Sequence, residues 1–299
     1  MSVTGRGRAG AKVILLGEHA VVYGRPALAT GIPLTLEAEA VRGAGPALQS
    51  DAAADDRGPR LVRAAADALG LDPAEWIVRV RSEIPAGRGL GSSAALSVAT
   101  LRALAQAGGC PMSSDDELVL GRRLEVLFHG TPSGIDPAAA ALGCCFRFVR
   151  GDPPAVQPLA NRVAIPLLIA FGDTVRSTAA AVGGLRDRWQ ADRARHERAF
   201  DRVAGVVTAG QAALERGDLE AFATACDANQ DLLVELGVSS PEIDARVATA
   251  RRAGALGAKL TGGGAGGAII AVAPDPEPVV HALRNAGAHV SAVTVPSAR

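Results

Sequence analysis

The sequence predicts an α+β protein with two domains, and three observations carry this prediction. Short β-branched runs and longer Ala- and Leu-rich segments occur in both halves of the chain, without the regular alternation of a doubly wound sheet. The length of 299 residues is enough for two compact domains with real cores. The Pro-rich segment 151–158 has the composition of a linker. We therefore expect one domain over residues 1–155 and a second over residues 160–299.

The composition excludes several classes of protein. Hydrophobic residues make up 48% of the chain and charged residues 21%, as in ordinary globular proteins. Lys plus Arg equals Asp plus Glu at 31 each, so we expect neither a nucleic acid nor a membrane surface as partner. The four cysteines form no Cys-x-x-Cys pair, which favours free thiols in a reducing compartment. The sequence has no signal-peptide core and no apolar run of membrane-span length, so we expect a cytoplasmic protein.

The first half of the chain begins with strands. Residues 11–17 and 19–24 are short, β-branched and closed by glycine, which is typical of strands. Ser114 and Glu117 have capping-box spacing at the start of a helix. The other elements predicted here are a strand at 32–41, a loop at 41–60, a helix at 61–70, a strand at 75–84, a glycine loop and long helix within 85–109, a helix at 113–130, and a loop, short helix and strand within 131–151.

The second half is predicted to contain longer helices. Ser240 or Ser239 is the expected cap of a helix that ends near residue 254. The other predicted elements are a strand at 163–172, one long helix at 186–216, a helix at 218–236, two strands around a glycine loop within 258–274, and a short helix before a last strand at 289–296.

The glycine-rich loop "PAGRGLGSSAA", residues 85–95, is the strongest local chemical signal. Its glycines leave backbone N–H groups unobstructed, and the helix that follows adds further N–H groups and the positive end of its dipole. This arrangement suits phosphates, and Ser92 and Ser93 could add hydroxyls to a phosphate or to Mg²⁺. The Walker A lysine and the G-x-G-x-x-G spacing are both absent. By itself the loop could also be simply a tight turn, which is the less favoured reading.

A second glycine run, "TGGGAGGA" at residues 261–268, lies between two apolar strands. Alone it reads as a flexible hairpin loop. Two such loops beside apolar strands make a ligand shared by both loops more plausible.

Four titratable residues occur in otherwise apolar segments of the sequence. Glu125 and Asp136 could divide metal binding and proton abstraction between them, as phosphoryl transfer requires. The alternatives are an ordinary surface glutamate and an aspartate that caps a helical turn. Glu18 and His19 interrupt a buried stretch, and could serve a ligand or be a capped Glu and a satisfied His.

Three segments resemble the signatures of the GHMP kinases. They are "KVILLGEHAVVYG", "IPAGRGLGSSAA" with the later "HGTPSGID", and "KLTGGGAGG". They occur in the family's order and span residues 11 to about 270. Within the superfamily the chain is most similar to mevalonate kinases, because Ala20 and Val21 follow Gly-Glu-His where galactokinases carry Thr-Asp.

The resemblance implies a fold and an activity. The implied fold is the two-domain GHMP kinase fold, with an N-terminal ribosomal-protein-S5-like domain, a C-terminal ferredoxin-like domain and the active site in the cleft between them. The implied reaction is ATP-dependent phosphorylation of the 5-hydroxyl of mevalonate in isoprenoid precursor synthesis. The implied cofactors are ATP and Mg²⁺, and related kinases are often homodimers.

The resemblance also implies roles for individual residues. Asp136 matches the family's proposed catalytic base, and Lys12 matches the lysine that assists the hydroxyl and the γ-phosphate. Ser93 and Glu125 match the Mg²⁺ ligands. Residues that match the acceptor pocket are Glu18, His19 and Thr178. Residues assigned to nucleotide binding are Ser82, Gly87, Arg88, Gly89, Leu90, Gly91, Ser92, Ser93, Gly263 and Gly264.

Two features leave alternatives open. Arg88 stands where the family commonly has a small residue, and could reach a phosphate or point to solvent. Rival functions are another GHMP kinase, such as phosphomevalonate kinase or mevalonate 3-kinase, and a non-catalytic GHMP-fold ligand sensor. The joint presence of Lys12, Ser93, Glu125 and Asp136 argues against the sensor. A nicotinamide oxidoreductase fails on the glycine spacing.

Overall fold

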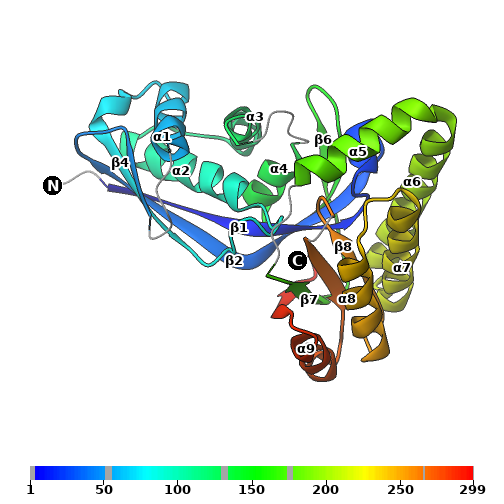
Figure 1. Ribbon diagram of the computed structural model, residues 1–299. Coiled ribbons are helices and arrows are strands. Elements are labelled where there is room, and N and C mark those ends of the chain that lie inside the picture. The colour runs from blue at the N-terminus through cyan, green and yellow to red at the C-terminus, as the bar shows by residue number, and fades with distance from the viewer. Residues whose placement is uncertain (1–3, 51–55, 129–133, 174–177, 265–266, 299) are drawn as a thin grey trace. The chain divides into compact units, whose positions relative to one another are not determined.

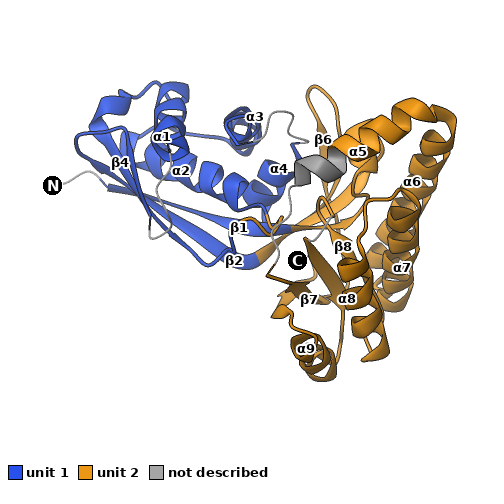
Figure 2. Cartoon of the chain, viewed as in Figure 1, with its two compact units in different colours: residues 1–12, 33–86, 91–143 blue, residues 13–32, 87–90, 144–299 orange. Residues whose placement is uncertain are grey.

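A computed structural model describes residues 4–50, 56–128, 134–173, 178–264 and 267–298 (Figure 1). The chain divides into two compact units (Figure 2). Unit 1 comprises residues 1–12, 33–86 and 91–143, and unit 2 comprises residues 13–32, 87–90 and 144–299. Both units contain strands and helices, so the predicted α+β class is confirmed.

Unit 1 packs helices against one face of a sheet. Its strands are β3 (Ala47–Ser50), β4 (Trp76–Ser82) and the adjoining parts of the long strands β1 (Thr4–Leu16) and β2 (Ala27–Arg42). β2 pairs antiparallel with β4, and β3 pairs parallel with β4. The helices are α1 (Arg57–Ala68), α2 (Ser92–Gly108), α3 (Ser114–Glu125) and α4 (Ile135–Leu142), and α2, α3 and α4 pack on one another.

Small residues allow α2 to lie directly on β1. A Cβ atom at Gly7 would lie 2.0 Å from the Ala99 carbonyl oxygen of α2, so only glycine fits there. The facing stretch of α2 is rich in buried alanines, which bring the helix backbone close without leaving voids. The fit therefore depends on residue size at the contact.

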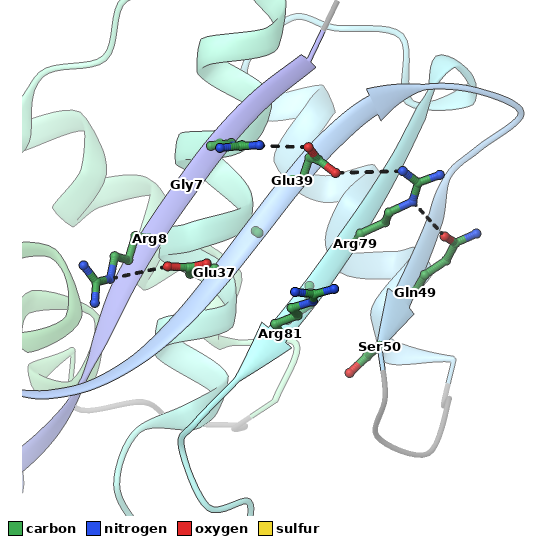
Figure 3. A pocket seen from close by; sticks show the side chains of 11 residues that line it. Gly7, Arg8, Glu37, Glu39, Gln49, Ser50, Arg79 and Arg81 are labelled. Carbon is green, nitrogen blue, oxygen red and sulfur yellow. Dashed lines mark hydrogen bonds and ion pairs between the residues drawn. The ribbon is translucent and has the colours of Figure 1, made fainter.

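The other face of this sheet is charged and exposed (Figure 3). Glu39 on β2 pairs with Arg6 on β1 and with Arg79 on β4, each at 3.8 Å, and Arg79 donates to Gln49 on β3. These residues border a hollow of about 810 Å³. None of the residues assigned to the site from the sequence lines this hollow, so it belongs to the solvated side of the sheet.

Unit 2 contains a four-stranded antiparallel sheet in the order β10-β7-β9-β8. Its strands are β7 (Ile165–Phe171), β8 (Gly257–Thr261), β9 (Ala268–Val272) and β10 (His289–Val295). The helices are α5 (Thr178–Ala191), α6 (Arg193–Arg216), α7 (Leu219–Glu235), α8 (Pro241–Arg252) and α9 (Pro276–Asn285). Helices α7 and α8 pack on β8, and every residue of β8 and β9 is buried.

Two further strands of unit 2 belong to the larger, six-stranded sheet. β5 (Cys145–Val149) pairs with the start of β2, and β6 (Ala155–Pro158) pairs with β5. The second half of the predicted linker 151–158 is thus a strand in a hairpin, and reading all of it as a linker was wrong. The domain boundary expected between residues 155 and 160 stays a prediction.

The predicted strand over residues 19–24 is wrong. The chain forms a 3₁₀ helix, η1 (Ala20–Tyr23), which ends at Gly24 in the left-handed conformation. His19 before it has a φ of 61°, which extended strands do not adopt. The β-branched residues Val21 and Val22 suggested a strand, but the turn at His19 decided the local structure.

The predicted single helix over residues 186–216 is in fact two helices. α5 ends at Ala191 and α6 begins at Arg193. Asp192 between them has non-helical backbone, with φ −141° and ψ 77°, and its side chain accepts a hydrogen bond from the Arg195 N–H at 3.1 Å. An aspartate in this position caps a new helix at the expense of continuing the old one.

The structure also corrects or decides three details of the predicted helix caps and element limits. The capping box of α3 is formed by Ser113 and Asp116, one residue before the predicted pair. The predicted loop 41–60 contains β3 and the start of α1. Ser240 is the cap of α8, as one of the two alternatives held. None of the helices that the structure describes has the long apolar run that a membrane span requires.

Candidate active site

Lys12 and Asp136 form an ion pair within unit 1. Lys12 lies on β1 and is 3% exposed, and its Nζ is 2.9 Å from Asp136 Oδ1. Asp136 is in the first turn of α4, where the helix dipole favours a negative charge. Gly134 in the left-handed conformation turns the chain into this helix. The pair places a cation and a potential base next to each other, largely out of water.

Glu125 ends α3 and is almost completely buried. Among the described residues, its Oε2 has no hydrogen-bond partner. Burial and, after it, the nearby Asp136 raise the pKa of Glu125, Lys12 opposes the shift, and the result is a pKa of about 8. A buried carboxyl oxygen without a partner is a natural ligand for a cation.

The described residues hold no group of three His, Cys, Asp or Glu side chains that could bind a metal by themselves. Mg²⁺ is commonly held by one or two carboxylates together with the phosphates of a substrate. The residues present fit that pattern, because Glu125 offers one buried carboxylate and Ser93 offers a hydroxyl on the first turn of α2.

The first glycine loop leads into α2 as the sequence predicted. Gly91 is the residue before the helix, with a φ of 75°. A Cβ atom at Gly91 would lie 2.7 Å from Cγ of Lys12, so the lysine stem passes directly over this position. Ser92 and Ser93 then open α2, whose first N–H groups have no acceptor within the helix. The end of the loop and Lys12 therefore come together.

The two glycine loops approach each other within unit 2. A Cβ atom at Gly262 would lie 3.5 Å from the Gly89 carbonyl oxygen. Gly263 and Gly264 follow, and a side chain at Gly264 would strike the Val238 carbonyl oxygen. Of the other residues assigned to the nucleotide, Leu90 is buried, Gly87 has a φ of 70°, and Ser82 accepts a hydrogen bond from the Ile84 N–H.

A buried polar network holds Glu18. Lys259 on β8 forms an ion pair with Glu18 Oε1, and both residues are fully buried. Asn229 on α7 donates from Nδ2 to Glu18 Oε2 at 3.3 Å, and its Oδ1 accepts from the Gly17 N–H at 3.1 Å. The Gly17–Glu18 turn is thus fixed from both α7 and β8.

His19 is held neutral in this environment. Its pKa is lowered to about 4, mainly by burial and also by the positive charges of Arg188 and Lys259, while a hydrogen bond to the Gly263 backbone opposes the shift. In the part of the chain that the structure describes, His19 Nε2 is buried and has no partner. A neutral imidazole with an unused nitrogen can accept a hydrogen bond from, or donate one to, a ligand.

The sequence did not single out Lys259 or Asn229. A lysine between Ala258 and Leu260 in an apolar strand is the signal that could have identified Lys259. Asn229 lies on a helix of ordinary composition, and nothing in its local sequence marks it. Thr178 is the first residue of α5, and its side chain lies outside the described residues.

Comparisons with known proteins identify the family of the chain. The profile described as "GHMP kinases N terminal domain" matches residues 60–144, and the one described as "GHMP kinases C terminal" matches residues 211–292. A mevalonate kinase of Pyrococcus horikoshii is 32% identical over 296 residues, covering 88% of this chain and 87% of the relative. A mevalonate kinase of Methanothermobacter thermautotrophicus is 34% identical over 271 residues, covering 88% of each.

Solved structures show the same fold. The crystal structure of L. major mevalonate kinase in complex with R-mevalonate has a TM-score of 0.90 and is 29% identical, covering 100% of this chain and 98% of that one. The predicted two-domain GHMP fold and the resemblance on which it rested are both confirmed. With relatives above 30% identity over nearly nine tenths of its length, the chain belongs to the GHMP kinase family.

Proposed function

We propose that this protein is a mevalonate kinase, which transfers the γ-phosphoryl group of ATP to the 5-hydroxyl of mevalonate. The observation that carries the proposal is the pair of Lys12 and Asp136, 2.9 Å apart and beside the end of the glycine loop. A base, a cation and a phosphate-binding loop are the parts that phosphoryl transfer to an alcohol needs.

The chemistry assigned to the pair is as follows. Asp136 accepts the proton of the acceptor hydroxyl while the hydroxyl oxygen bonds to the γ-phosphorus. The bond from that phosphorus to the bridging oxygen of ATP breaks, and ADP leaves with the electron pair. Lys12 stabilises the negative charge that develops on the hydroxyl oxygen and the transferring group. Catalysis comes mainly from positioning and electrostatics.

Glu125 and Ser93 would hold Mg²⁺ together with the nucleotide. The unpartnered Oε2 of Glu125 supports this assignment. When bound, the metal would neutralise charge on the phosphates. The glycine loop would bind the phosphates through its backbone N–H groups.

The choice of mevalonate rests on the relatives and on the turn that begins with Glu18. The curated relatives named above are mevalonate kinases, and the L. major enzyme was solved with R-mevalonate. In this chain, His19 offers a buried ring nitrogen without a described partner, which suits a ligand hydroxyl or carboxylate. A role for Thr178 in the same pocket and a homodimeric state stay predictions.

An acceptor panel tests the proposal. Release of ADP is measured with mevalonate, phosphomevalonate, homoserine and galactose offered separately. We expect turnover with mevalonate in clear preference to the others. Preference for phosphomevalonate, or phosphorylation of mevalonate at its 3-hydroxyl, would assign a different GHMP kinase activity. Binding without turnover of any acceptor would indicate a ligand sensor.

Asp136→Asn tests the mechanism within that activity. The asparagine keeps an oxygen near Lys12 but cannot take up the proton, so kcat should fall by about 10² to 10⁴. The affinity for an ATP analogue, measured by calorimetry, should change little. Asp115→Asn, at an exposed acid on α3, is the matched control. Near-wild-type turnover in Asp136→Asn would remove this residue from the mechanism.

A further inference from the structure

Arg88 lies at the centre of the first glycine loop, where GHMP kinases commonly have a small residue. Its guanidinium Nη1 donates a hydrogen bond to the Gly172 carbonyl oxygen at 2.5 Å. Its Cζ lies 5.2 Å from the centroid of the Phe171 ring, at cation–π distance. All three residues belong to unit 2, so these contacts lie within one compact body.

The surface that Arg88 contacts is itself fixed. Phe171 is the last residue of β7, is 8% exposed, and lies opposite His289 of β10 in the antiparallel register. The His289 ring stacks on Phe171 with centroids 5.6 Å apart, and His289 Nε2 is 2.8 Å from Asp173 Oδ1. The end of β7 is therefore a buried, packed point of unit 2 to which a loop can be attached.

The loop around Arg88 has few side chains, and Leu90 is the buried one that follows. Gly87 and Gly89 flank Arg88, both with positive φ, and neither has a side chain. A glycine loop loses much conformational entropy when it is ordered around a ligand. A loop that is already held in place pays less of that cost on binding.

We propose that Arg88 is a positioning residue that ties the first glycine loop to the end of β7, through the Phe171 ring and the Gly172 carbonyl. The inference rests on the proposed function in so far as the loop binds the phosphates of ATP. The arginine pre-orders the loop, and its effect on catalysis runs through the loop's affinity for the nucleotide.

Loss of the Arg88 side chain should change KM for ATP and leave the other kinetic constants nearly unchanged. Arg88→Ala should raise KM for ATP about 10-fold, since it removes one charged hydrogen bond and one cation–π contact. KM for mevalonate and kcat should each stay within about 2-fold. Arg88→Lys should recover part of the loss, because lysine can reach a carbonyl but lacks the planar face. Arg81→Ala is the matched control, because Arg81 is an exposed arginine on the charged sheet face (Figure 3).

A double-mutant cycle separates this role from direct phosphate binding. If Arg88 acts through Phe171, Phe171→Leu also raises KM for ATP. The fold-increase in KM of the double variant is then smaller than the product of the two single fold-increases. If Arg88 instead contacts phosphate, Phe171→Leu has little effect and the two changes are independent. Independent effects would overturn the proposal, provided that thermal unfolding shows Phe171→Leu to be folded.

Hydrogen exchange supplies a readout that needs no nucleotide. In the free protein, the amides of residues 87–91 should exchange faster in Arg88→Ala than in wild type, while Arg81→Ala leaves them unchanged. Unaltered exchange in Arg88→Ala would show that the arginine does not order the loop. Absence of kinase turnover in wild type would refute the proposed function and leave this exchange result standing.

Discussion

The buried carboxyl of Glu125 should make the stability of the metal-free protein fall as the pH rises. Its pKa is about 8 in the folded protein, against an ordinary value of 4.5. Between these two values the folded state binds a proton that the unfolded state has already lost. Because the unfolded state binds fewer protons in this range, the free energy of unfolding decreases with pH and flattens above pH 8.

The size of this effect follows from the shift. Each pH unit over which the two states differ by one proton is worth about 1.4 kcal/mol. From pH 6 to pH 9 the folded and unfolded states differ by a proton for about two units, so wild type should lose roughly 2 to 3 kcal/mol from this group. Glu125→Gln has nearly the same size and no proton to release, so this part of the pH dependence should disappear.

Urea unfolding in the presence of a chelator, at pH 6, 7, 8 and 9, measures the difference. Buried cysteines such as Cys145, whose pKa is raised to about 11, contribute to both proteins alike and cancel in the comparison. Asp115→Asn changes an exposed acid on the same helix and should reproduce the wild-type slope. Parallel stability curves for wild type and Glu125→Gln would refute the reasoning, because they would show that Glu125 ionises normally in the fold.

Two further predictions concern the turn that begins with Glu18 and the phosphate loop. The pKa of His19 is lowered from 6.5 to about 4, mainly by burial, so the unfolded state binds a proton in this range that the folded state does not. The free energy of unfolding should therefore fall by about 3 kcal/mol as the pH falls from 6.5 to 4. His19→Gln should remove this loss when unfolding is measured against acid pH, and an unchanged pH dependence in that variant would contradict the prediction. Gly91→Ala should reduce kcat/KM at least 10-fold, because the alanine Cβ would displace the Lys12 stem. The φ of 75° at this position also disfavours a side chain by about 1 kcal/mol. Full activity of this variant in a steady-state assay would count against the close contact with Lys12.

Much of the fold could be predicted because local patterns agreed with it. Alternation identified β2 and β4, and the glycine that precedes Ser92 marked the start of α2. The failures occurred where a single side chain or dihedral overrode the pattern. Asp192 capped a new helix within a sequence that has a continuous helical pattern. His19 turned the chain within a β-branched segment that is typical of a strand.

The site shows the same division. Lys12, Glu125 and Asp136 were identified from motifs, and the structure brings the three together in unit 1. The partners of Glu18 were not found from the sequence, because Asn229 and Lys259 lie more than two hundred residues away. Contacts over such separations leave no periodic signal in the chain.

The sequence by itself determined which residues are available for chemistry, and in which order. It identified two glycine loops, the acids Glu125 and Asp136 and a lysine in the first strand, because turns, caps and strands are decided by a few neighbouring residues. Only the tertiary structure decided their state. Burial is a property of packing, so the raised pKa of Glu125, the neutral ring of His19 and the attachment of Arg88 to Phe171 depend on side chains that the fold brings together.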